Sequence, residues 1–182
     1  MKKQLLLCAL LLQAICMHAQ EQFGKGTKTI DVNLGLGSPY WGAGYKHAFP
    51  FNPRIGMEYG ITDEISLGGS IAYSGAKYDW GNIYGSHYTL KYNAYFISAR
   101  GAYHFKLDNE KLDPYLGASI GYVVVSVKDD SPYGSSVSSV GSGVGYGGFG
   151  GIRYYIKPKL GLNAELGYSS FSFLNLGVSF KL

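Results

Sequence analysis

Residues 174–182 read LNLGVSFKL, and their pattern decides the fold. The apolar residues of this stretch fall at every second position: Leu174, Leu176, Val178, Phe180 and Leu182. Because successive side chains of a strand point to opposite faces, the alternation predicts a β-strand with one apolar face. The sequence stops on this strand instead of on a polar tail, so we expect its edge to pair with the first strand.

Seven earlier segments alternate in the same way, which predicts eight strands in all. Their approximate bounds are 27–37, 54–61, 65–74, 93–105, 114–127, 144–156 and 160–169. The connections after the second, fourth and sixth strands are short, at 62–64, 106–114 and 157–159, and those after the first, third and fifth are long, at 38–53, 75–91 and 128–143. Short turns at one end and long loops at the other are typical of an up-and-down outer-membrane β-barrel.

The second face of the strands indicates which side is inside. Alternation alone also fits lipocalins and β-sandwiches, whose apolar faces point inward. Here the second face is small and glycine-rich, in a sequence with 27 Gly, and its isolated charges are Asp31, Glu58, Arg100, Arg153, Glu165 and Lys181. Small residues fit a narrow lumen, where opposite charges neutralise one another. We therefore expect an all-β protein, an eight-stranded antiparallel transmembrane β-barrel with its apolar face toward lipid.

Aromatic residues gather near both ends of the expected strands. Those near the long loops are Tyr73, Tyr92 and Tyr95, and those near the short turns are Tyr103, Phe105, Tyr154 and Phe180. This distribution predicts two interfacial girdles.

The N-terminal segment has the layout of a secretory signal peptide. Lys2 and Lys3 precede an apolar run over residues 5–15, which is too short to span a bilayer as a helix, and Ala19 follows as a small residue. The expected division of the chain is a signal peptide over 1–19, a short N-terminal segment over 20–26 and the barrel over 27–182.

The composition of the mature chain narrows its chemistry. Cys8 and Cys16 both fall in the signal peptide, so we expect no disulfide and no cysteine metal site. Removing Lys2 and Lys3 leaves 14 basic against 12 acidic residues, a balance that gives no indication of nucleic-acid binding.

Strand pairing gives the inward charges an expected geometry. If residues 157–159 form a tight turn, Arg153 faces Asn163, and Glu165 lies diagonally within reach of Arg153. Pairing of the last strand with the first brings Lys181 toward Asp31. We expect these charges to plug and rigidify the lumen, with a gate for small ions as the alternative.

Two features of the sequence bear on bound groups or catalysis. Gly143, Gly145 and Gly148 have GxGxxG spacing, but a strand and a tight turn follow instead of the helix that a phosphate site needs. His47 and His87 lie in long loops that Ser70, Ser74, Ser86 and Ser131 could approach, but no spacing singles out a catalytic triad. We therefore expect no enzyme activity, no cofactor and no metal site. A lipid-modifying enzyme of the membrane is the alternative.

The long loops are the other candidate site. They are dense in Tyr, Trp, Gly and Asn, a composition suited to contacts with carbohydrate or protein. The candidate contact residues are Tyr40, Trp41, Tyr45, Tyr78, Trp80 and Tyr84. The alternative is that these aromatics only extend the girdle.

The sequence resembles the small OmpA/OmpX-type outer-membrane β-barrel family. DPYLGASIGY at 113–122 looks like the fifth-strand entry of that family, and NLGVSFKL at 175–182 looks like its barrel-assembly signal. The residues that carry the signal are Asn175, Gly177, Phe180 and Leu182, the last in place of the more familiar terminal aromatic.

The resemblance implies export to the outer membrane of a Gram-negative bacterium. The implied partners are outer-membrane lipid and lipopolysaccharide, the barrel-assembly machinery, and a surface protein or glycan. The leading hypothesis is a barrel with a side-chain-filled lumen that serves envelope structure and adhesion-like surface interaction. A lipid-modifying enzyme and a narrow ion or small-solute channel remain the alternatives.

Overall fold

The structure is a computed structural model that describes residues 23–37, 44–83, 86–129, 136–138, 141–168 and 170–182. The predicted signal peptide lies outside these residues. The strands are β1 (Lys28–Leu36), β2 (Tyr45–His47), β3 (Asn52–Gly60), β4 (Ile65–Ile83), β5 (Ser86–His104), β6 (Leu112–Asp129), β7 (Ser136–Ser138), β8 (Gly143–Lys157), β9 (Leu160–Gly167) and β10 (Leu174–Lys181).

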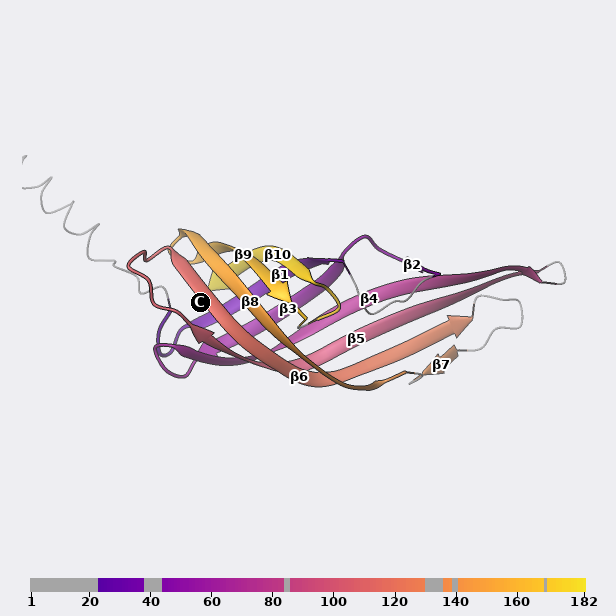
Figure 1. The fold of residues 1–182 in the computed structure, drawn as a ribbon, viewed down its shortest axis with the longest axis horizontal. Coiled ribbons are helices and arrows are strands. Elements are labelled where there is room, and N and C mark those ends of the chain that lie inside the picture. The colour runs from indigo at the N-terminus through magenta and orange to yellow at the C-terminus, as the bar shows by residue number, and fades with distance from the viewer. Residues whose placement is uncertain (1–22, 38–43, 84–85, 130–135, 139–140, 169) are drawn as a thin grey trace, which may run out of the picture.

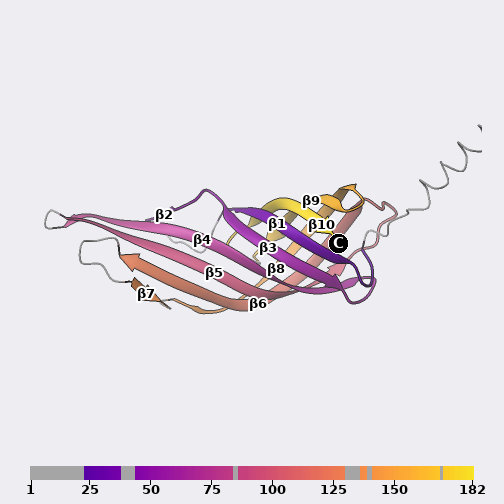
Figure 2. The same cartoon turned by 180° about the vertical axis from the view of Figure 1, so that it is seen from behind.

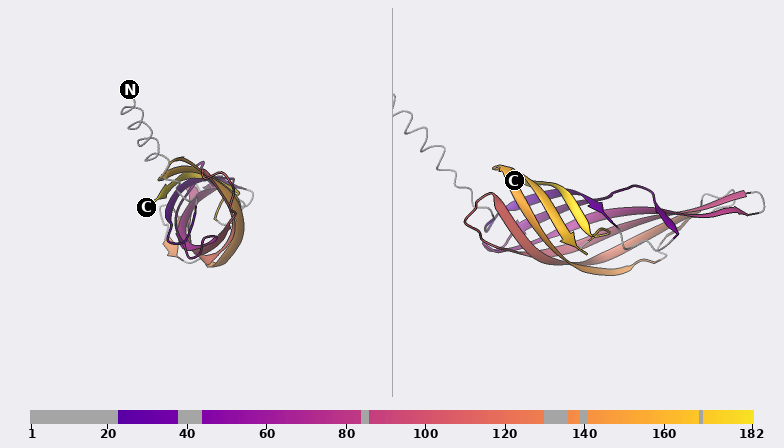
Figure 3. Two further views of the ribbon diagram at one scale, coloured as in Figure 1. Left: turned by 90° about the vertical axis from the view of Figure 1, so that its left-hand side faces the viewer. Right: turned by 45° about the horizontal axis from the view of Figure 1, so that its top comes forward.

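Eight of these strands close into an antiparallel barrel, which confirms the predicted fold class. Each of them pairs with its neighbour in the chain, and β1 pairs with β10 to complete the ring. Figure 3 shows the closed ring when the barrel is viewed along its length. The two additional short strands, β2 and β7, pair with the outer parts of β4 and β6.

Three strands continue far beyond the ring. The segment 75–91, expected to be a long loop, is mostly a hairpin of β4 and β5, whose pairing runs from Ile65 opposite Tyr103 to Ile83 opposite Ser86. The outer part of β6 pairs with β5 as far as Asp129 opposite Leu90. Figures 1 and 2 show β4, β5 and β6 extending together past the end of the barrel, flanked by β2 and β7. We call this part of β2, β4, β5, β6 and β7 the extension.

The two faces of the barrel wall have opposite chemistry. Outward residues are large, apolar and exposed, as at Ile120 with 61% of its surface accessible, whereas inward Asp31 is 3% accessible. The described residues include no helix that is long and apolar enough to cross a bilayer. An apolar exterior around a polar interior is the reverse of a soluble barrel and suits a lipid environment.

The aromatic positions agree with the girdle prediction at all but one residue. Tyr73 and Tyr95 point outward at the same height, with ring centroids 5.2 Å apart, and Tyr103 packs against Phe105 at the turn end. Tyr92 differs, because it shares the inward face of β5 with buried Ala94 and Phe96. The prediction for Tyr92 is therefore wrong: it lies past the rim, on the inner side of the extension.

The seam between β1 and β10 is closely packed. Val32 faces Val178, and Asn33 faces Gly177, in an unbroken register from Thr29 to Leu36. A Cβ atom added at Gly177 would lie only 2.0 Å from the carbonyl oxygen of Val32. Glycine at this position lets the two backbones approach, as it does where strands bend strongly in small barrels.

Substitution of this glycine should therefore hinder closure. We expect Gly177→Ala to destabilise the barrel by about 1–3 kcal/mol, because the added methyl group must displace backbone. The measurement is the folded fraction after refolding into detergent, scored by heat-modifiable gel mobility.

Gly56→Ala is the matched control. Gly56 also faces inward, but a Cβ atom added there would lie 3.5 Å from Ser70, which is an ordinary contact distance. Equal refolding yields for the two variants would show that the close backbone approach at Gly177 is not required for closure.

Candidate functional site

The lumen holds a set of buried charges that strands from all around the ring supply. The sequence contains three arginines, Arg54 on β3, Arg100 on β5 and Arg153 on β8, and all three are buried inside the barrel. Four carboxylates face them: Asp31, Glu58, Asp113 and Glu165. Every one of these positions is an inward position of a strand whose outward positions are apolar, which is why the sequence brings them together.

Arg153 is the centre of the half of this network nearer the turns. Its Nη2 lies 2.7 Å from Asp31 Oδ2 and 2.6 Å from Glu58 Oε2, and its Nη1 lies 3.2 Å from Asp113 Oδ2. Ser179 on β10 also donates a hydrogen bond to Asp31. One guanidinium therefore ties together carboxylates from β1, β3 and β6, as its planar set of five donors allows.

Glu165 is the centre of the second half. Arg54 contacts both of its carboxylate oxygens, and Arg100 Nη2 lies 2.7 Å from Oε2. The same Arg100 nitrogen lies 3.4 Å from Glu58 Oε1, which joins the two halves. The charged groups thus form one continuous chain across the lumen.

Aromatic rings complete this filling. The guanidinium of Arg100 stands 3.8 Å from the ring centroid of Phe149, and that of Arg153 stands 4.4 Å from the centroid of Tyr115. The hydroxyl of Tyr115 donates to Glu165. We call Arg54, Arg100, Arg153, the four carboxylates, Tyr115 and Phe149 the plug, because they occupy the narrow interior together.

The structure places the six predicted lumen charges unequally. Asp31, Glu58, Arg100, Arg153 and Glu165 belong to the plug. Lys181 lies beyond it toward the turns, opposite Thr29, with its Nζ 4.5 Å from the ring centroid of Tyr155. The strand register places Ser179 opposite Asp31 and Lys181 at the next inward position, diagonal to Asp31, as the pairing of the last strand with the first predicts.

The pairing inside the plug also differs from the expectation. Arg153 faces Asn163 as predicted, but Arg153 and Glu165 take other partners. Sequence reasoning missed Arg54 and Asp113. Arg54 lies four residues before Glu58 on the same face of its strand, and Asp113 lies one residue before the segment 114–127 that was expected to be a strand, so continuing the alternation to the start of each strand would have found both.

A serine, a histidine and an aspartate meet at the turn end of the lumen. His104 Nε2 lies 3.0 Å from Ser66 Oγ, and Nδ1 lies 2.7 Å from Asp113 Oδ1. This order of contacts is that of a hydrolase triad. However, Ser66 is 0% accessible, and the ring of Phe23 stacks on His104 with centroids 3.6 Å apart. The three groups therefore serve here as a buried hydrogen-bonded link between β4, β5 and β6.

Among the described side chains, the predicted histidine of the long loops lies apart from the predicted serines. His47 is exposed on β2, whereas Ser70 and Ser74 are buried inside the wall. The side chains of His87 and Ser86 lie outside the described part of the structure, as does Ser131. No group of three potential metal ligands occurs among the described residues.

The predicted assembly signal occupies β10 and its end. Asn175 is buried on the inward face and Gly177 lies at the seam, while Phe180 and Leu182 are exposed on the outward face. Recognition of these residues by an assembly machine stays a prediction.

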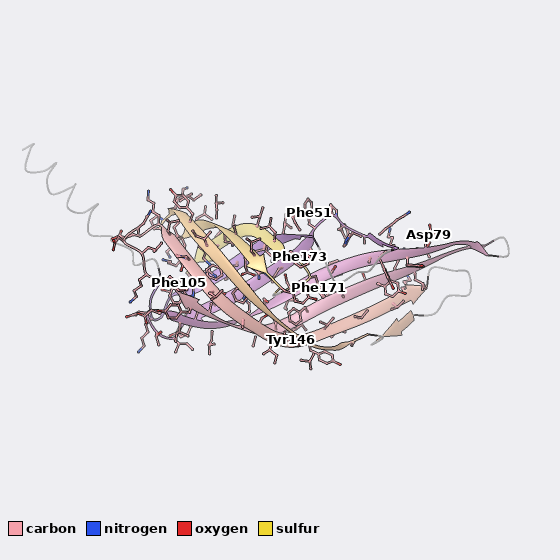
Figure 4. All side chains as sticks on the ribbon, in the orientation of Figure 1. Phe51, Asp79, Phe105, Tyr146, Phe171 and Phe173 are labelled. Carbon is pink, nitrogen blue, oxygen red and sulfur yellow. The ribbon has the colours of Figure 1, made fainter. Side chains whose placement is uncertain are left out.

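Beyond the plug, the inner side of the wall is apolar and then aromatic. The rings of Phe96 and Phe171 pack edge to face against each other in a cluster with Ala72, Ala94 and Val125, and a cavity of about 320 Å³ opens beside them. Tyr146 and Tyr168 line the same cavity from exposed positions, Tyr146 on the outward face of β8, so the cavity opens in the wall between the start of β8 and the connection from β9 to β10. Figure 4 shows Phe171 and Tyr146 at this end of the barrel, where the extension begins.

Three tyrosines continue this surface on the extension. The ring of Tyr45 lies 5.1 Å from that of Tyr78 and 5.2 Å from that of Tyr92, which β2, β4 and β5 bring together. We call Tyr45, Tyr78 and Tyr92 the tyrosine cluster. Of the other predicted contact residues, Tyr40, Trp41 and Tyr84 lie outside the described residues, and Trp80 is on β4 with its side chain not described.

Comparisons with known proteins agree with the barrel. The family model "Outer membrane protein beta-barrel domain" matches residues 6–181. The outer membrane protein OprG from Pseudomonas aeruginosa is similar in structure, with a TM-score of 0.56 and 12% identity over 90% of this chain and 99% of that chain. Neisserial surface protein A has a TM-score of 0.53 and 20% identity over 86% and 96% of the two chains. A search of curated protein sequences finds no match.

The central position of Arg153 makes it the most sensitive residue of the plug. Arg153→Met keeps much of the volume but leaves Asp31, Glu58 and Asp113 buried without their shared cation. We expect a loss of about 3–5 kcal/mol in the free energy of unfolding. The free energy of unfolding is measured by urea titration of the barrel in lipid vesicles, followed by circular dichroism.

Lys157→Met, at the exposed end of the same strand, removes the same charge and should change the free energy of unfolding little. If both variants unfold at the same urea concentration, the network does not hold the barrel together.

Proposed function

Because the chain belongs to the outer membrane protein β-barrel domain family, we propose that it is a non-conducting barrel of a Gram-negative outer membrane that carries a binding surface on its extension. The short turns then face the periplasm, and the extension projects from the cell, as is usual for such barrels. One observation carries the proposal. The strands that surround the plug continue past the ring into the extension, where their inner side carries the tyrosine cluster.

The plug argues against passage of solutes through the lumen. Three guanidiniums and four carboxylates interlock across the lumen, and Phe149 and Tyr115 stack on two of the guanidiniums. An eight-stranded ring leaves an interior that side chains can fill. A solute would have to separate buried ion pairs to pass, which costs several kcal/mol for each pair.

The tyrosine cluster and the cavity support surface interaction. Aromatic rings give large, rigid contact area at low cost in conformational entropy, and tyrosine adds a hydroxyl for hydrogen bonds. The rings of Tyr45, Tyr78 and Tyr92 are held by paired strands and not by a flexible loop. This arrangement favours a saccharide or a protein segment as the partner.

Conductance tests the first half of the proposal. We expect the wild-type barrel in a planar lipid bilayer to show no steady single-channel current, because the plug occupies the lumen. A steady current that changes in Arg100→Gln or Glu58→Gln, but not in the outward variant Leu116→Ala, would indicate an ion channel instead.

Removal of the cluster tests the second half. We expect Tyr78→Ala combined with Tyr92→Ala to lose at least tenfold in binding on arrays of immobilised glycans and extracellular proteins, because two of three aromatic contacts disappear. Tyr103→Ala, at the turn-side girdle, is the control and should bind like the wild type. If the wild type binds no probe on either array, the surface half of the proposal fails while the conductance result still stands.

A further inference from the structure

A row of lysines crosses the extension on the side opposite the tyrosine cluster. Lys46 on β2 faces Lys77 on β4, Lys77 faces Lys91 on β5, and Lys91 faces Lys128 on β6, each directly in strand register. We propose that this lysine row binds the phosphate groups of anionic glycolipid in the outer leaflet of the membrane.

The four ammonium groups share one face. Lys77 lies on the same face of β4 as exposed Ile71 and outward Tyr73, and Lys91 lies on the same face of β5 as Tyr95. Lys46, Lys77 and Lys128 are exposed and Lys91 is half-buried. Neighbouring strands are separated by about 4.8 Å, so the row spans about 14 Å of the outer surface.

The height of the row matches a headgroup layer. Lys77 follows Tyr73 by four residues, which is about 14 Å along a strand and about 10 Å above the girdle once the strand tilt is included. The positions between are Gly75 and Asn93, which face each other and are neither charged nor large. The row therefore stands just above the hydrocarbon boundary, where lipid phosphates lie.

Direct pairing of like charges needs a cause. Two like charges opposite each other on adjacent strands destabilise the pair, and this row repeats the arrangement three times. Asp79, labelled in Figure 4, lies one step further out on the same face of β4, diagonal to Lys91, and neutralises part of the row. A line of external phosphates would offset the remaining repulsion, because compact ammonium groups bind phosphate as point charges.

The partner follows from the row's shape. A flat line of separated cations beside a lipid-facing wall suits several phosphates fixed at one height, which a leaflet of phosphorylated glycolipid supplies. The inference rests on insertion of the barrel in the outer membrane, as proposed above, and it is independent of the partner of the tyrosine cluster.

The experiment compares wild type with Lys46→Gln, Lys77→Gln, Lys91→Gln and Lys128→Gln combined. The folded barrel in detergent is titrated with diphosphorylated lipid A, and bound lipid is counted by native mass spectrometry. A basic residue near an anionic lipid surface contributes about fivefold in affinity, so the combined variant should lose at least about 100-fold. Dephosphorylated lipid A should bind both proteins equally weakly.

The matched control removes four exposed lysines at the opposite end: Lys106, Lys111, Lys157 and Lys159, each changed to Gln. It carries the same change in net charge and should bind lipid A like the wild type. Heat-modifiable gel mobility confirms that every variant is folded before it is titrated.

Three outcomes would overturn the inference. Equal lipid A binding by wild type and row variant would show that the lysine row is not a binding site. An equal loss in the control variant would show that the loss comes from net charge and not from the row. Dextran sulfate is titrated in parallel as a soluble polyanion. If its binding depends on the four lysines and that of lipid A does not, the row is a site for a soluble polyanion. None of these results bears on conductance, so the plugged-barrel proposal is tested separately.

Discussion

The need to satisfy every backbone hydrogen bond inside hydrocarbon governs this structure. A lipid environment offers no water to an unpaired strand edge, so β10 must meet β1. Closure with eight strands gives a narrow lumen. Strong curvature brings the backbones of β1 and β10 close together, which position 177 permits because it is glycine. The side chains inside the lumen must be compact, and their charges must neutralise one another. The apolar exterior and the charged interior are thus two consequences of one closed ring.

The distribution of cations follows from that geometry. All three arginines lie within the plug, and the lysines of the turns and of the extension lie outside it. A guanidinium can bridge several carboxylates at fixed angles, as Arg153 does with Asp31, Glu58 and Asp113, whereas an ammonium group suits a hydrated surface. Arginine therefore occurs in the plug, whereas lysine occurs at the turns, on the extension and, at Lys181, at the turn end of the lumen.

The sequence was sufficient for the ring and insufficient for the extension. Strict alternation predicted the eight barrel strands, because a wall between lipid and lumen must be apolar on one side only. The outer parts of β4 and β5 lie outside the hydrocarbon and have polar surroundings on both sides, so Lys77, Tyr78, Lys91 and Tyr92 show no apolar period and resemble a loop. Inside the plug, alternation predicted which residues face inward, but partner choice depends on strand stagger around the ring. Arg153 therefore pairs with carboxylates far apart in the sequence instead of nearby Glu165.

Because β4 and β5 stay paired from the turn side across the rim of the barrel, with their one register shift only further out between Asp79 and Gly81, the described strands have no joint at the membrane surface. A force applied at the tip pulls along the strands and loads many interstrand hydrogen bonds in shear at the same time. The extension therefore behaves as a stiff arm, and tension on it reaches the barrel wall directly. A surface attachment made through such an arm is anchored by the whole ring.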